Sequence, residues 1–301
     1  MTLTLQQVTK KYKDFVAVEN LSFSIEPGEI YGLIGQNGAG KTTTFRMILD
    51  LQETTEGSIL WEGQSINRVS RNVLGYLPEE RGIFPQLKVA EQLQFFGELR
   101  GMDKTLLKQE IDYWIQRFEL EEKRNDKAET LSKGNQQKVQ LIASFIHRPK
   151  FLILDEPFSG LDPVNKDLLK DAILHLRNEG MTILFSSHQM ENVEELCDNI
   201  TLLKRGRALF SGPLIDLKRQ YGKQRLTIRT ELPTEQLAAL KGVKSAVRSG
   251  DEVVCQLADE TYAESIFHYV SEGQFIEKFS LDYLSLDEIF KLKVGESNEA
   301  V

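Results

Sequence analysis

Several features are scarce in this chain of 301 residues, and each scarcity excludes a class of protein. Only two cysteines occur, Cys197 and Cys255, far apart and outside any CxxC pattern, so neither a disulfide framework nor a zinc site is indicated. No stretch approaches the roughly 18 uncharged apolar residues that a membrane-spanning helix needs. The first residues alternate apolar and polar side chains and soon become charged, which favours a strand over a signal peptide. These absences predict a protein of the reducing cytoplasm.

Basic residues are also fewer than acidic ones. Lysine and arginine number 37 against 45 aspartates and glutamates, which gives a formal net charge of −8. An acidic chain argues against nucleic acid as the main partner. The length is that of about two domains and is ample for a substantial core.

The most informative string present lies at residues 35–43, which read Gly-Gln-Asn-Gly-Ala-Gly-Lys-Thr-Thr. It follows the apolar run 30–34, which predicts a buried strand, and precedes a helix expected from Thr43 to Leu51. A glycine-rich turn between a strand and a helix is the context that a phosphate-binding loop requires. The sequence therefore predicts a site for a nucleoside triphosphate.

The chemistry of this loop follows from its residue types. Glycines let the backbone N–H groups turn inward around a phosphate, and the positive end of the next helix adds to the attraction. Lys41 is expected to reach the β- and γ-phosphates, and the Thr42 hydroxyl to ligate Mg²⁺. The predicted loop contacts are Gly35, Asn37, Gly38, Gly40, Lys41, Thr42 and Thr43.

The segments around the loop indicate an α/β fold with a helical insertion. Residues 1–75 are predicted to be mostly strand, and residues 87–148 show the helical period. Two short apolar strands, 151–154 and 182–185, are separated by a helix over 163–178. This βαβ alternation predicts a parallel sheet core.

A second module is expected after Gly222. Its elements follow the order β-α-β-β-α-β, which is the ferredoxin-like order, and a last amphipathic segment follows. We therefore predict a nucleotide-binding domain over 1–222 and an accessory α+β domain over 223–301. The predicted elements of the second domain are 225–229, 234–240, 243–247, 252–257, 262–270, 275–279 and 286–293.

Two further strand ends carry candidate catalytic residues. Asp155 and Glu156 end the apolar strand 151–154, where the first could hold the Mg²⁺ shell and the second could polarise the attacking water. His188 follows the strand 182–185, at the edge of a parallel sheet where ligands bind, and could donate to a γ-phosphate oxygen.

The order of these motifs resembles the ATP-binding subunit of ATP-binding-cassette (ABC) transporters. Between the helical insertion and the acidic strand stands Leu131-Ser132-Lys133-Gly134-Asn135-Gln136, which is similar to that family's LSGGQ signature. Ser159-Gly160-Leu161-Asp162 follows the acidic strand. The resemblance covers about residues 1–220 and implies a P-loop cassette fold with a mixed sheet and a helical subdomain near 87–148.

The resemblance also implies roles. Two copies, or this chain and a related ATPase, are expected to hold two ATP molecules between them, with the signature facing the other copy's ATP. Glu156 would be the general base, Asp162 would communicate across the dimer, and Tyr12 would stack on adenine. The signature contacts would come from Ser132, Lys133, Gly134 and Asn135.

Two departures from the family pattern stand out. Lys133 and Asn135 replace the usual Gly and Gln of the signature, while Ser132 and Gly134 remain. Glu79 stands where the family places a glutamine, keeps the reach and can ligate Mg²⁺. This pattern and the added C-terminal module resemble the bacterial exporter branch that includes sodium-exporter-like ATPases.

The predicted function is accordingly an ATPase subunit at the inner face of the cell membrane that drives a separately encoded integral membrane permease. One rival is a non-transport ABC ATPase acting on ribosomes or nucleic acid. The single phosphate loop, the acidic charge and the short insertion count against it. A pure nucleotide sensor is the other rival, and the presence of both Glu156 and His188 counts against that.

Overall fold

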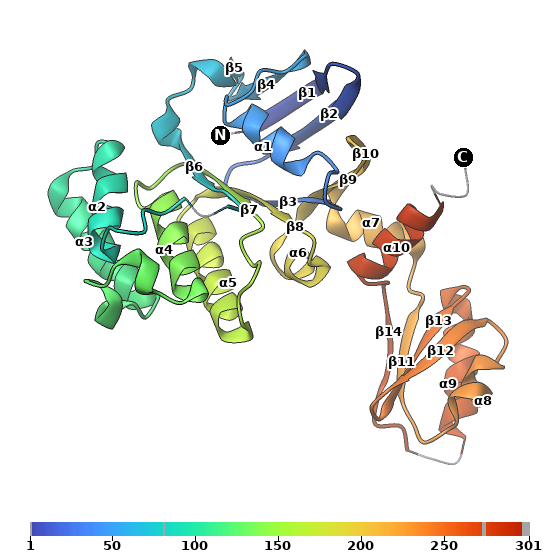
Figure 1. Cartoon of the computed structure of the whole chain (residues 1–301). Coiled ribbons are helices and arrows are strands. Elements are labelled where there is room, and N and C mark those ends of the chain that lie inside the picture. The colour runs from blue at the N-terminus through green and yellow to red at the C-terminus, as the bar shows by residue number, and fades with distance from the viewer. Residues whose placement is uncertain (1, 81, 273–274, 297–301) are drawn as a thin grey trace. The chain divides into compact units, whose positions relative to one another are not determined.

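A six-stranded sheet forms the centre of the first of two compact units, Met1–Gly212 and Pro213–Val301. Its strand order is β10-β9-β3-β8-β7-β6, and the five strands from β9 to β6 pair in parallel (Figure 1). Every residue of β3, β7 and β8 is buried, which explains their continuous apolar sequences. The strands are β3 (Ile30–Gly35), β6 (Leu74–Leu77), β7 (Phe151–Asp155), β8 (Thr182–Ser187), β9 (Asn199–Lys204) and β10 (Arg207–Pro213).

The computed structural model describes residues 2–80, 82–272 and 275–296. None of the helices that these residues form is long and apolar enough to cross a membrane.

A second sheet packs over the phosphate-loop helix in the same unit. Its order is β2-β1-β4-β5 with antiparallel pairs. Helix α1 (Lys41–Ile48) contributes Phe45, Met47 and Ile48 to the core that the two sheets share. The helix begins earlier than the predicted Thr43, because Gly40 already accepts the first helical hydrogen bond from Thr44. The strands are β1 (Leu3–Tyr12), β2 (Phe15–Ile25), β4 (Glu56–Trp61) and β5 (Gln64–Ser65).

Helices inserted between β6 and β7 form the predicted helical part, on the left of Figure 1. They are α2 (Val89–Leu99), α3 (Lys104–Arg117) and α4 (Lys133–Phe145). Helices α5 (Pro163–Asn178) and α6 (Met190–Leu196) connect the later strands, and α5 has the bounds that its pattern predicted. Short 3₁₀ helices occur at Ile66–Arg68, Arg71–Val73, Glu121–Lys123, Ala128–Thr130 and Glu260–Tyr262.

The second unit has a four-stranded antiparallel sheet of order β12-β13-β11-β14, which is the ferredoxin-like arrangement. Its core lies between this sheet and two helices. The elements are α7 (Leu214–Tyr221), β11 (Arg225–Arg229), α8 (Thr234–Ala238), β12 (Val243–Ser249), β13 (Glu252–Leu257), α9 (Ala263–Ser271), β14 (Phe279–Asp282) and α10 (Leu286–Glu296).

Several element ends in this unit differ by a few residues from the sequence expectation, and two differences bear on the fold. The last strand begins at Phe279 instead of Phe275, whose side chain is 89% exposed. The unit begins at Pro213, before the predicted boundary at 222, because α7 packs with α10. The Lys293 ammonium lies 5.9 Å from the centre of the Tyr221 ring in that contact.

Candidate nucleotide-binding site

The phosphate loop connects β3 to α1 in a backbone shape that glycine makes possible. Gly38 and Gly40 have φ angles of 79° and 108°, a region that side chains disfavour. A Cβ on Gly40 would lie 2.7 Å from the Ala17 carbonyl oxygen, so no other residue fits without a shift. The loop therefore lies close against β2 with its backbone free to face a ligand.

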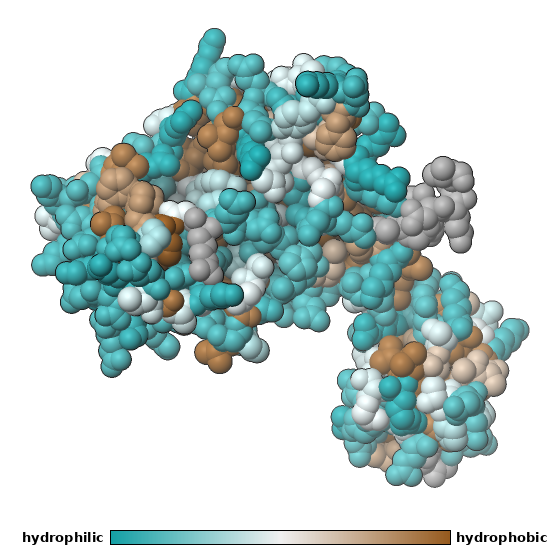
Figure 2. Space-filling view, viewed as in Figure 1, coloured by the Kyte–Doolittle hydropathy of each residue, from teal (hydrophilic) through white to brown (hydrophobic). Residues whose placement is uncertain are grey.

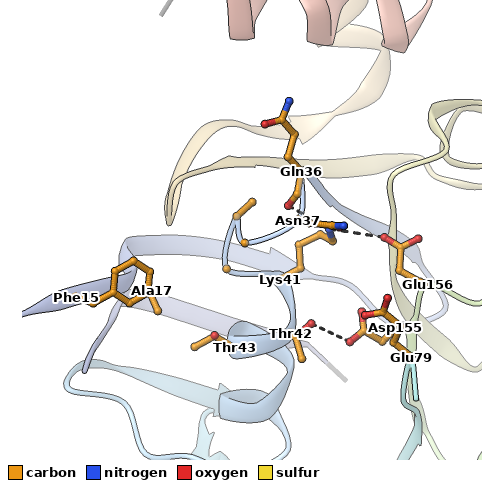
Figure 3. A pocket seen from close by; sticks show the side chains of 13 residues that line it. Phe15, Ala17, Gln36, Asn37, Lys41, Thr42, Thr43, Glu79, Asp155 and Glu156 are labelled. Atoms are coloured by element: carbon orange, nitrogen blue, oxygen red, sulfur yellow. Dashed lines mark hydrogen bonds and ion pairs between the residues drawn. The ribbon is translucent and has the colours of Figure 1, made fainter. Parts of the chain in front are cut away.

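A pocket of about 310 Å³ opens beside this loop, at the edge where β3 and β7 end. Figure 3 shows that its polar side chains come from two sides, the loop and α1 on one side and the end of β7 on the other. The lining residues are Phe15, Ala17, Gln36, Asn37, Gly38, Ala39, Gly40, Lys41, Thr42, Thr43, Glu79, Asp155 and Glu156. Gly35, a predicted contact, lies under the loop, and its carbonyl accepts a hydrogen bond of 2.7 Å from Lys41 Nζ.

Lys41 supplies the positive charge of the pocket. Its side chain is 8% exposed, and its Nζ lies 3.7 Å from Glu156 Oε1 (Figure 3). Nζ also donates to the carbonyl oxygens of Gly35 at 2.7 Å and Gln36 at 3.4 Å. A phosphate oxygen can replace the longer of these contacts and is attracted by the charge of the buried ammonium.

Thr42 and Asp155 meet across the pocket as predicted for a metal-binding pair. Thr42 Oγ1 donates to Asp155 Oδ2 over 3.1 Å, although the two residues are far apart in sequence. Asp155 is 1% exposed, and its Oδ1 accepts a 2.6 Å hydrogen bond from Ser186 Oγ. No group of three acidic, histidine or cysteine side chains among the described residues could hold a metal. One hydroxyl and one carboxylate fit Mg²⁺, which keeps waters and phosphate oxygens as its other ligands.

Glu156, the predicted base, has its two carboxylate oxygens in different surroundings. Its Oε2 accepts the His188 Nδ1–H at 2.7 Å, whereas its buried Oε1 has no hydrogen-bond partner among the described residues. Its backbone φ of 50° is unusual outside glycine, and its N–H donates to Ser186 Oγ at 3.0 Å. A carboxylate held at one oxygen and open at the other can accept a proton from a water in the pocket.

His188 follows β8 and stands beside Glu156, with its Nδ1 2.7 Å from Glu156 Oε2. It is not among the residues that line the pocket, and its side chain is 53% exposed. Its contact with a γ-phosphate stays a prediction.

Two aromatic side chains near the loop, Tyr12 and Phe15, differ in whether they line the pocket. Tyr12 ends β1, does not line the pocket, and donates its hydroxyl to Gln52 Oε1. The Lys10 ammonium lies 5.2 Å from the centre of its ring. Phe15, the first residue of β2 after the turn at 13–14, lines the pocket and is 63% exposed. Sequence reasoning missed Phe15, and an aromatic at the exposed start of a strand was the available signal.

The signature residues stand apart from this chain's own pocket. Ser132 caps α4 by accepting the Asn135 N–H at 3.3 Å, and none of the residues 132–135 lines the pocket. Asp162 caps α5 in the same way, and hydrogen bonds from Asn165 hold the pKa of its carboxyl below the usual value. The two caps are neighbours, since a Cβ on Gly134 would lie 3.2 Å from Asn165 Nδ2.

The fold and the pocket define the class first. A phosphate loop at the edge of a parallel sheet, with a hydroxyl–carboxylate pair and a second carboxylate beside it, is the nucleotide site of a P-loop NTPase.

Comparisons with known proteins then give the family. A model described as "ABC transporter" matches residues 18–159, and one described as "ATP-binding protein DrrA1-3-like, C-terminal domain" matches residues 212–294. The chain is 47% identical over 293 residues to the uncharacterized ABC transporter ATP-binding protein YhaQ of Bacillus subtilis, covering 97% of this chain and 98% of that protein. The chain belongs to the ABC transporter ATP-binding proteins, with a DrrA-like C-terminal domain.

Other similarities agree with this assignment. The chain is 34% identical to ABC transporter ATP-binding protein NatA of Bacillus subtilis, over 71% of this chain and 91% of that protein. It is also 34% identical to the lipopolysaccharide export system ATP-binding protein LptB of Haemophilus influenzae, over 70% of this chain and 90% of that protein.

Solved structures share the fold. A structure described as the ATP-binding subunit of an ABC transporter has a TM-score of 0.69 at 30% identity, covering 73% of this chain and 93% of that one. The dimeric cassette MJ0796 has a TM-score of 0.65 at 24% identity, covering 70% and 98%. The predicted P-loop cassette fold is confirmed, and the chain is an ATP-binding subunit of a transporter instead of a ribosome- or nucleic-acid-acting relative.

Proposed function

We propose that the chain works as a head-to-tail dimer, with itself or with a related ATPase, in which each copy's signature completes the other copy's ATP site. One observation carries this proposal. Ser132 and Gly134 begin α4, where helix N–H groups favour an anion, yet they do not line the pocket of their own chain. A second copy supplies the phosphate that this helix start is suited to contact.

The residues of one pocket divide the chemistry among them. Lys41 binds the β- and γ-phosphates, Thr42 and Asp155 hold Mg²⁺, and Glu156 takes a proton from the attacking water. Mg²⁺, when bound, neutralises charge that develops on the phosphate oxygens. Glu79 is proposed as a further oxygen ligand, since it lines the same pocket.

The proposed membrane partner is a separately encoded integral permease, and the chain would bind it as a peripheral subunit on the cytoplasmic face. An apolar patch at the start of the helical insertion is suited to this contact. Phe84, Phe95 and Leu99 are 45%, 42% and 66% exposed, and brown apolar atoms gather over α2 on the left of Figure 2. Phe84 also follows the loop that carries Glu79, so the patch is continuous in the chain with the nucleotide pocket.

The proposed direction of transport is export, and the proposed division of labour is a catalytic cassette with an accessory C-terminal domain. Similarity to LptB, whose name includes an export system, supports the direction. The second unit has its own core and a sheet of its own, which supports an accessory role.

Purification with a trapped chain tests the proposal. Tagged Glu156→Gln chain, extracted from its host's detergent-solubilised membranes with Mg-ATP, should bring down a multi-spanning protein in fixed ratio, identified by mass spectrometry. Phe95→Ser with Leu99→Ser should weaken that recovery, whereas Val247→Ser, at a 64% exposed site in the second unit, should not. Recovery of ribosomal proteins or DNA with no membrane protein would reject the transport role.

A further inference from the structure

Helix α4, which begins at the signature, is joined along its length to β6 and the loop after it. Near its C-terminal end, the His147 ring donates from Nε2 to the Leu74 carbonyl oxygen at 3.1 Å. One turn earlier, α4 and β6 are in close contact at Gly75, where a Cβ would lie 2.3 Å from the Ser144 carbonyl oxygen. These two contacts hold the C-terminal part of the helix and the residues just after it against the strand.

Gln140 makes the third connection, and it lies closest to the nucleotide pocket. Gln140 is 4% exposed, and its Nε2 donates to the carbonyl oxygens of Pro78 at 3.2 Å and Glu80 at 3.0 Å. These two carbonyls flank Glu79, which lines the pocket opposite Thr43 (Figure 3).

The side-chain amide of Gln140 supplies hydrogen-bond donors to two loop carbonyls at once. A loop carbonyl that is buried without a donor is costly, and a glutamine NH₂ offers two N–H groups from one atom. An apolar side chain could fill the same space but would leave both carbonyls unpaired and the loop around Glu79 free to shift.

We propose that Gln140 is a positioning residue that couples the signature end of α4 to Glu79, so that engagement of the partner's ATP alters the pocket of this chain. The inference rests on the proposed dimer with its signature in trans. When the start of α4 contacts a phosphate of the ATP bound to the other copy, any shift of the helix moves the Gln140 amide. The 78–80 loop, which is hydrogen-bonded to that amide, moves with it. The two ATP sites then act cooperatively.

Steady-state hydrolysis with the complete chain tests this role. Gln140→Met keeps an unbranched side chain of similar length and removes both donors. We expect the Hill coefficient for ATP to fall from between about 1.5 and 2 toward about 1, since it is bounded by the number of coupled sites. ATP affinity of the isolated chain, measured without Mg²⁺, should change by less than about twofold, because Gln140 does not line the pocket and Glu79 is proposed to act through the metal.

A matched variant separates this role from loss of a buried amide. Gln92 is fully buried on α2, and its Nε2 donates to the Leu87 carbonyl oxygen at 3.3 Å. Its Oε1 accepts from the Phe84 N–H at 2.8 Å, so it holds the segment that follows the 78–80 loop and, among the described residues, makes no hydrogen bond with that loop itself. Gln92→Met should keep the wild-type Hill coefficient. Gln140→Leu also removes the N–H donors, places no charge against the two carbonyls, and gives the same prediction as Gln140→Met, should the latter not fold.

The outcomes are distinct. A wild-type Hill coefficient that persists in both folded Gln140 variants would overturn the role of Gln140 and leave the dimer intact. A wild-type coefficient of one, with no ATP-dependent dimer in solution, would overturn the proposed dimer and with it this inference. Equal loss in Gln92→Met would show a general packing effect and also overturn it.

Discussion

At the scale of single residues, the site depends on how each ionised side chain is held. Glu156 has one oxygen bonded to His188 and one buried oxygen beside Lys41, and Asp155 is fixed by Thr42 and Ser186. Both oxygens of Asp155 therefore accept hydrogen bonds, whereas Glu156 has one restrained oxygen and one without a hydrogen-bond partner among the described residues. This difference supports the proposed division between a metal-binding and a basic carboxylate, although the two stand next to each other in sequence.

The base assignment predicts the behaviour of Glu156→Gln. The amide keeps the size of the side chain but accepts no proton, so turnover should fall by at least about 100-fold, the usual scale for loss of a general base. Nucleotide binding should persist, because Lys41 and the loop are unchanged. Phosphate release and ATP affinity measured on the same preparation check this, and turnover at the wild-type rate would refute the assignment.

The base-stacking aromatic is decided by a second pair of variants. The family resemblance points to Tyr12, whereas the pocket is lined by Phe15. We expect Phe15→Ala to weaken ATP affinity by about tenfold, since stacking of a base on an aromatic ring contributes about 1–3 kcal/mol. Tyr12→Ala is the matched control and should lose less; a larger loss there, measured by equilibrium binding, would return the role to Tyr12.

At the scale of elements, α4 carries two functions at its two ends. Its first turn holds the signature, and its later turns attach to β6 and the loop around Glu79. A helix is a suitable connector because its backbone hydrogen bonds keep its two ends in fixed relation.

The start of α4 predicts a variant with separable effects. Ser132→Arg places a bulky cation where the partner's γ-phosphate is expected, so turnover should be abolished. Affinity of the isolated chain for ATP should stay within about twofold, because Ser132 does not line its own pocket. Ser271→Arg, on α9 of the second unit, is a control for the substitution itself. Loss of affinity in the Ser132 variant at low protein concentration would contradict a signature in trans.

At the scale of the whole molecule, the chain divides into two units with separate sheets and separate cores. All the proposed nucleotide contacts belong to the first unit, and the second has the ferredoxin-like strand order. Such a division is expected when one part does chemistry and another responds to a partner.

Deletion of residues 213–301 tests that division. The remaining chain should bind ATP with an affinity within about threefold of the full chain, because no lining residue of the pocket is removed. A shorter deletion from 224 onward keeps α7 without its α10 contact and should be less stable in thermal unfolding. Loss of nucleotide binding in both would show that the second unit is part of the first.

Much of this protein was determined by its sequence alone. The phosphate loop, the acidic strand end, the helical insertion and the ferredoxin-like order were all predicted, because glycine conformations and hydrophobic periods act over a few residues. The family followed from the order of motifs. Helix α5 matched its predicted bounds because Asp162 caps it and Pro163 begins it.

Other features were decided only by the tertiary structure. The register of parallel β7 and β8 places Ser186 beside Asp155, and the fold brings His188 to Glu156 and the Gln140 amide to the 78–80 loop. It also places Phe15, in preference to Tyr12, at the pocket. These contacts join residues distant in the chain, and which atoms meet depends on strand register and helix packing. A local sequence pattern does not specify these contacts, because the residues of one segment do not determine which other segment it will pack against.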